Sequence, residues 1–162
     1  MKRILVFAAR MDQAHRRALE DGFVAALARE GIAARPSYEL FEGSPPRQEE
    51  MRAILAQRGF DGVLVAAMKG VRNEMHWAPT GPSYWSNWYG WGSPGYVVTD
   101  QVSRCETSLW EARNGTEKMV WVAASKTLNA EDQGELVSSV TDAVVPELTQ
   151  SCFLLASGPA VR

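Results

Sequence analysis

Residues 4–9 read Ile-Leu-Val-Phe-Ala-Ala, and an amphipathic pattern follows them over residues 12–30. A continuous apolar run of this length is typical of a strand that is covered on both faces of a sheet. In the second segment Leu19, Phe23 and Leu27 recur every four residues, which places them on one face of a helix. A buried strand followed by an amphipathic helix predicts the start of an α/β fold.

The same alternation continues through the first half of the chain. Residues 32–41 return to an extended pattern, in which Pro36 indicates an edge strand. A short helix then ends at Gly59, and residues 62–69 form another apolar run, whose extended pattern continues towards Trp77. Crossover connections between parallel strands are right-handed, so we expect these three strands to lie parallel in the order 2-1-3.

The second half of the chain begins with a predicted antiparallel hairpin. Two extended stretches, 96–112 and 117–128, flank the dipeptide Asn114-Gly115. This dipeptide is strongly favoured in two-residue hairpin turns. The hairpin is expected to add two antiparallel strands to the parallel ones.

A C-terminal helix and a short strand complete the prediction. Residues 130–148 have a helical apolar period, although Pro146 is expected to bend or end that helix. The apolar run at residues 152–156 predicts a last strand of uncertain placement. The predicted fold is α/β (α+β mixed), with the element order β-α-β-α-β-β-β-α-β and a mixed sheet of order 2-1-3-4-5. Residues 1–162 form a single domain, without an internal repeat or a linker.

The composition is that of an ordinary globular domain and argues against several classes of function. Apolar residues make up 46% and charged residues 22% of the 162 residues. The 17 Lys and Arg against 19 Asp and Glu give a formal charge of -2, which argues against generic nucleic-acid binding. No apolar run approaches the ~20 residues of a membrane-spanning helix. Residues 1–3 with residues 4–9 imitate a signal peptide, but Arg10 interrupts the run too early, so we interpret residues 4–9 as a strand.

Residues 77–96 form the most unusual segment of the chain. It holds four of the six tryptophans and three of the four tyrosines, and no helix or strand period fits it. A loop of this length in a compact domain is usually functional or disordered. The rings could stack on sugars, proline-rich peptides or bases, sit at a membrane interface, or fold back over the sheet as a lid. The candidate binding residues are Trp77, Tyr84, Trp85, Trp88, Tyr89, Trp91 and Tyr96.

Residues with catalytic or metal-binding chemistry are sparse. The only two histidines are His15 and His76, and the HExxH and CxxC spacings of zinc sites are both missing. Cys105 lies within a predicted strand and Cys152 opens another; buried structural thiols are the first interpretation and a disulfide is the second. No GxSxG motif and no phosphate-binding glycine loop are present. We therefore expect no catalytic residue, no metal and no cofactor.

The order of several short motifs resembles a known group of proteins. These motifs are the helical segment and strand from Asp12 to Tyr38, the strand at residues 60–65 (Phe-Asp-Gly-Val-Leu-Val), and the hairpin pieces Glu106-Thr107-Ser108-Leu109-Trp110-Glu111, Gly115 and Met119-Val120-Trp121. Together they resemble small secreted or lipid-anchored envelope proteins of Gram-negative bacteria, of unknown function, whose fold is like the TolB amino-terminal domain and CsgG. Members of this group carry a Tyr/Gly/Pro-rich loop before the hairpin, where residues 77–96 lie here.

The resemblance implies a putative lipoprotein-type, non-enzymatic component of the periplasm or cell envelope. Its role would be binding or assembly through the aromatic segment, with an envelope protein, a glycan or a second copy as partner and no nucleic acid. The chain has no transmembrane span, so membrane contact would come only through a lipid anchor that this sequence does not show. The alternative is a small-ligand-binding or enzymatic domain, possibly cytoplasmic, that uses the carboxyl ends of the parallel strands, where residues 10–12 follow the first strand.

Overall fold

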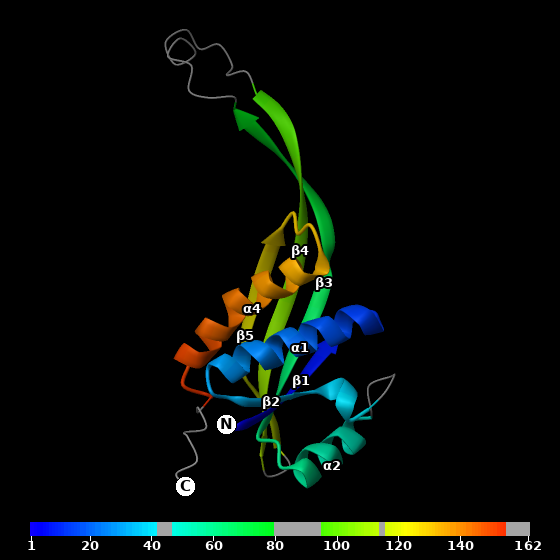
Figure 1. Cartoon of the computed structure of the whole chain (residues 1–162), viewed down its shortest axis with the longest axis vertical. Helices are drawn as coiled ribbons and strands as arrows, with labels where there is room; N and C mark the ends of the chain where they lie inside the picture. The colour runs from blue at the N-terminus through cyan, green and yellow to red at the C-terminus, as the bar shows by residue number, and fades with distance from the viewer. Residues whose placement is uncertain (42–46, 80–94, 114–115, 155–162) are drawn as a thin grey trace.

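A five-stranded mixed sheet forms the centre of the protein (Figure 1). The structure, a computed structural model, describes residues 1–41, 47–79, 95–113 and 116–154. The strands are β1 Arg3–Ala9, β2 Ala33–Pro36, β3 Gly62–Pro79, β4 Gly95–Arg113 and β5 Thr116–Leu128. The helices are α1 Gln13–Arg29, α2 Gln48–Arg58 and α4 Gln133–Gln150, with a 3₁₀ turn η1 at Ser37–Glu39.

The topology confirms the predicted α/β class and the predicted order of the five strands. The strands lie in the order β2-β1-β3-β4-β5. β1 is parallel to both β2 and β3, whereas β3, β4 and β5 are antiparallel to one another. β2 is an edge strand, as Pro36 indicated, because a proline cannot donate to a second neighbour. Arg113 pairs with Thr116, so the predicted hairpin is present, although its turn at Asn114-Gly115 lies outside the described residues.

Helix α1 begins and ends at residues whose chemistry favours a boundary. The Asp12 carboxylate accepts hydrogen bonds from the backbone N–H groups of Ala14 and His15, which no carbonyl within the helix can satisfy. At the other end Gly31 has a φ of 73°, a left-handed conformation that glycine adopts at little cost. This confirms the predicted first helix.

Alternating strand residues point into two separate apolar clusters, one on each face of the sheet. Ile4 and Val6 of β1 belong to the main core beneath α1 and α4, which also contains Phe23 and Leu148. Leu5 belongs to a smaller cluster on the other face, where α2 packs. The members of the smaller cluster are Leu5, Leu55, Phe60 and Val63, with Phe7, Leu40, Phe41, Met51, Val65 and Ala112 packed around them.

Strands β3 and β4 extend well beyond the helices as a two-stranded ribbon (Figure 1). The register between them shifts between Met68 and Gly70, and Gly70 has a φ of 127°. A bulge of this kind bends a strand and increases its twist. We call the ribbon beyond this bulge, residues 70–79 and 95–104, the arm.

Two local predictions were wrong in the described residues. The extended segment at residues 32–41 is a strand only over Ala33–Pro36 and then turns into η1. The strand predicted at residues 152–156 is a turn over residues 152–154. Pro146 was expected to bend or end the last helix; it lies inside α4, which continues to Gln150, so it does not end the helix.

The apolar run after α4 does not join the sheet, and of its described residues only Leu154 is buried. Cys152 has a φ of 62°, which is incompatible with an extended strand. Leu154 packs into the main core, and the amino group of Met1 donates a hydrogen bond to the carbonyl oxygen of Phe153 at 2.7 Å. A short apolar run therefore does not distinguish a strand from a turn that buries a single side chain.

Gly22 allows α1 and α4 to approach each other closely, because a Cβ atom at this position would clash with Cγ1 of Val137. We expect Gly22→Ala to destabilise the protein by about 1 kcal/mol or more, since overpacking costs about 1–3 kcal/mol and alanine regains about 1 kcal/mol of helix propensity. The urea midpoint measures the change. In the Val137→Ala background the same substitution should be neutral or stabilising; an equal loss in both backgrounds would contradict this contact.

Candidate functional site

The first and last residues of the predicted aromatic segment, 77–79 and 95–96, form the far end of the arm (Figure 1). Of the candidate binding residues, Tyr96 lies in β4 and is exposed, and Trp77 lies in β3, where only its backbone is described. Trp77 pairs with Val97, and Ala78 pairs with Tyr96, so the two candidate positions lie near the end of the arm but are offset by one residue and are not partners across the ladder. Tyr84, Trp85, Trp88, Tyr89 and Trp91 lie outside the described residues.

Within the described residues, one face of the arm carries exposed apolar side chains between polar ones. Alternation along the strands places Val71 and Met75 of β3 on the same face as Val97 of β4, with Asn73 and Gln101 among them. The exposed fractions of the three apolar side chains are 53%, 74% and 59%. A two-stranded ribbon alone is marginally stable in water, and a row of exposed apolar side chains on it marks an interaction surface. The period over residues 71–77 was visible in the sequence, but the absence of a covering helix was not.

The opposite face of the arm is charged. The Glu74 carboxylate accepts from an Arg104 guanidinium nitrogen at 2.7 Å and from Lys126 Nζ at 2.9 Å. These hydrogen bonds, from Lys126 first and then Arg104, lower the pKa of Glu74. Further along the arm, His76 Nδ1 lies 3.3 Å from a carboxylate oxygen of Asp100. His76 is therefore an exposed strand residue beside a carboxylate.

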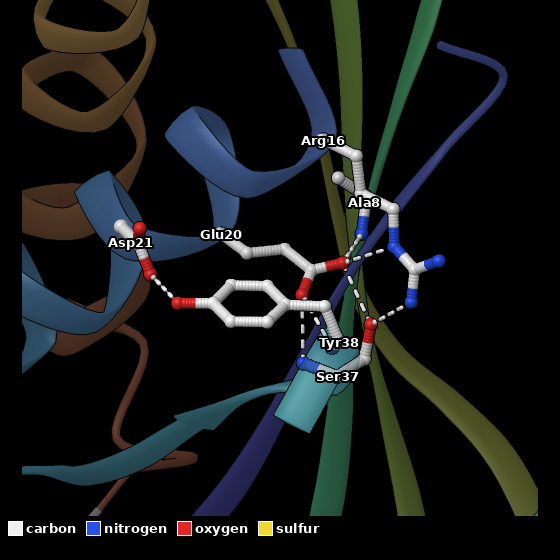
Figure 2. Close-up of polar contacts among 6 residues, drawn as sticks. All are labelled: Ala8, Arg16, Glu20, Asp21, Ser37 and Tyr38. Atoms are coloured by element: carbon white, nitrogen blue, oxygen red, sulfur yellow. Dashed lines mark hydrogen bonds and ion pairs between the residues drawn. The ribbon is translucent and has the colours of Figure 1, made fainter. Parts of the chain in front are cut away.

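A second polar site lies at the carboxyl ends of β1 and β2 (Figure 2). The Glu20 side chain from α1 is completely buried there. One carboxylate oxygen accepts from Ala8 N at 3.0 Å, Arg16 Nε at 2.9 Å and Ser37 Oγ at 2.6 Å. The other accepts from the backbone N–H groups of Ser37 at 2.7 Å and Tyr38 at 3.1 Å.

The partners of Glu20 are themselves held by packing. The Arg16 guanidinium lies over the rings of Phe7 and Phe41, at 5.3 and 5.4 Å from their centroids. Nearby, the Tyr38 hydroxyl donates to Asp21, and this hydrogen bond raises the pKa of Tyr38 to about 12 (Figure 2). The buried carboxylate thus ties α1 to the ends of both parallel strands.

The position of the Glu20 cluster can be compared with the alternative function, a ligand site at the carboxyl ends of the parallel strands. In open α/β sheets, ligands bind in the crevice at the carboxyl ends of the strands. The switch point in the order β2-β1-β3 lies between β1 and β3. The Glu20 cluster fills the neighbouring position at the carboxyl ends of β1 and β2, with five donors on one carboxylate. Sequence analysis missed the cluster because its members come from three separate elements.

The remaining candidate groups are dispersed. Cys105 is buried in the main core, where burial raises its pKa, and Cys152 is exposed after α4; neither is bridged. His15 pairs with Asp12 at the start of α1. Within the described ranges, no group of three or more His, Cys, Asp or Glu side chains could hold a metal ion. Among the same residues, no helix has the length and apolarity needed to cross a bilayer.

No protein-family model matches the chain, and no curated protein matches its sequence. Solved structures are similar to it. PelC from Paraburkholderia phytofirmans, solved as a dodecamer, has a TM-score of 0.54 and 16% identity over 91% of this chain and 86% of its own. The hypothetical protein CT253 from Chlamydia trachomatis has a TM-score of 0.50 and 6% identity, over 93% of this chain and 97% of its own. Lipoprotein GNA1162 from Neisseria meningitidis has a TM-score of 0.49 and 14% identity, over 93% of this chain and 99% of its own. The first two show a shared fold.

Proposed function

We propose that this chain is a non-enzymatic component of the cell envelope that works as an assembly of copies of itself. The proposal rests on one observation: Val71, Met75 and Val97 are exposed apolar side chains on one face of the arm. Soluble monomers seldom keep such a row without a use, and in an assembly a neighbouring copy would cover it. The envelope location rests on the resemblance of the motifs to envelope proteins, including the likeness to TolB and CsgG.

Two further points support an assembly role. PelC shares the fold and was solved as a dodecamer, so this fold is compatible with a large assembly. At the base of the arm a small pocket of about 70 Å³ opens between the first turns of α1 and α4, where Met11, Leu136 and Val137 contribute apolar walls. Met68, the residue that precedes the bulge, also lines this pocket.

The non-enzymatic part of the proposal rests on the resemblance to envelope proteins. At the carboxyl ends of β1 and β2 the Glu20 cluster occupies the sheet edge with the chain's own side chains. A small-ligand or enzymatic function at that edge stays the second candidate, and it would require Glu20 or Arg16 to exchange these partners for a ligand.

The test compares the mass of the parent with that of Met75→Thr/Val97→Thr. Threonine is β-branched and suits a strand but removes apolar area, so the fold should persist. We expect the parent to be an oligomer by light scattering and the variant to shift to smaller species at the same concentration.

Asn73→Thr/Gln101→Thr is the matched control, because it changes two polar residues on the same face of the arm. It should keep the parent's mass. A monomeric parent, or a Met75/Val97 variant with unchanged mass, would overturn the proposed function.

A further inference from the structure

The arm changes from a three-stranded sheet to a two-stranded ribbon at a defined point. The last described pair between β4 and β5 is Val102 with Leu128, whereas β3 and β4 stay paired as far as Pro79 and Gly95. We call the part beyond Val102, residues 73–79 and 95–101, the outer arm. A two-stranded ribbon by itself is marginally stable in water, so the contacts at its base decide how firmly the outer arm is held.

Asn129, the first residue after β5, lies at this point. Its φ of 49° is a left-handed conformation, in which asparagine is enriched, and it ends the strand before α4. The backbone N–H of Asn129 donates to the carbonyl oxygen of Gln101 at 2.8 Å, and its side-chain Oδ1 accepts from the Gln101 N–H at 2.7 Å. The side chain thus supplies the acceptor that a backbone carbonyl would supply if β5 continued along the arm.

The same side chain is linked to the other strand of the arm. Asn129 Nδ2 donates to Asp100 Oδ1 at 2.7 Å, and the second oxygen of this carboxylate lies 3.3 Å from Nδ1 of His76 on β3. Asp100 and Glu74 are direct partners in the β3–β4 ladder, and two carboxylates in opposite positions repel each other. Asp100 therefore depends on Asn129 and His76 as its partners, and its side chain is only 18% exposed.

We infer that Asn129 is a positioning residue for the arm: it continues the hydrogen bonding of β5 onto Gln101 and Asp100, and it thereby fixes the direction in which the outer arm leaves the body. Asp100 lies on the opposite face of the ladder from Met75 and Val97. Asn129 therefore acts on the exposed apolar side chains through the backbone that carries them. A contact surface held in one orientation loses less conformational freedom on binding than one that pivots.

Hydrogen exchange of the backbone amides tests the inference. Asn129→Gly removes the side chain, while glycine readily adopts the positive φ of this position. All variants are compared in the Met75→Thr/Val97→Thr background, so that contact between copies does not protect the arm. We expect the ladder amides of residues 73–77 and 96–99, which join β3 to β4, to exchange about tenfold faster, as the loss of one or two hydrogen bonds predicts.

Exchanging the donor and the acceptor gives a second test that does not involve glycine. Asn129→Asp keeps an acceptor for the Gln101 N–H but turns a carboxylate towards Asp100, so the outer arm should again exchange faster. Asp100→Asn/Asn129→Asp restores one donor and one acceptor with their roles reversed, and it leaves an amide oxygen for His76. This double variant should therefore return to the exchange rates of the reference background.

Ala130→Gly is the matched control, because it frees the adjacent backbone but removes no hydrogen-bonding side chain. It should leave exchange in the outer arm unchanged. The inference is overturned if Asn129→Gly changes no amide or Gln101 alone, if Ala130→Gly has an equal effect, or if the double variant exchanges as fast as Asn129→Asp. None of these outcomes depends on self-association, so the proposed function is decided separately by the mass measurements.

Discussion

Replacing Glu20 with glutamine is expected to lower the free energy of unfolding by about 3–5 kcal/mol, because it removes one partner of a buried ion pair. The glutamine has nearly the same shape, but its amide group would face N–H and O–H donors that the carboxylate now accepts from. Arg16, which is also buried, would lose its charged partner at 2.9 Å. Urea unfolding followed by circular dichroism measures the change.

The matched control is Glu39→Gln, which removes a carboxylate from an exposed ion pair. Arg35 and Glu39 are 3.4 Å apart, and their side chains are 63% and 45% exposed. Pairs of this kind contribute about 0–1 kcal/mol. Similar urea midpoints for Glu20→Gln and Glu39→Gln would show that the buried cluster does not stabilise the packing of α1 against β1 and β2.

Phe23→Ala is expected to cost a similar amount for a different reason. Phe23 is fully buried at the centre of the main core between α1 and α4. Truncating a buried phenylalanine removes transfer free energy and leaves a cavity, with a cost of about 3–5 kcal/mol. For a chain of this length the thermal midpoint should fall by roughly 10 °C.

Phe153→Ala provides the comparison, because this ring is partly exposed after α4. Its contact with the amino terminus uses the backbone carbonyl, which alanine retains. We expect a change below about 1 kcal/mol, in line with substitutions away from the core. A loss as large as that of Phe23→Ala would place Phe153 in the core instead.

The sequence alone determined the type and order of the main elements. Residues 4–9 and 62–69 are continuous apolar runs because these strands are covered on both faces, and the period of Leu19, Phe23 and Leu27 is set by the helix. Asn114-Gly115 predicted the hairpin, because few dipeptides can adopt the backbone conformation of a two-residue turn. Right-handed crossovers then limited the strand order to the one observed.

Only the tertiary structure determined which side chains are exposed to solvent and which are buried. No local pattern marks Glu20 as buried; it is buried because its five donors come from segments that only the fold brings together. Val71, Met75 and Trp110 follow ordinary strand periods, so a covering helix would have made them core residues. They are exposed because the helices cover only part of the sheet. A local period specifies which side chains share a face, whereas burial depends on what packs against that face.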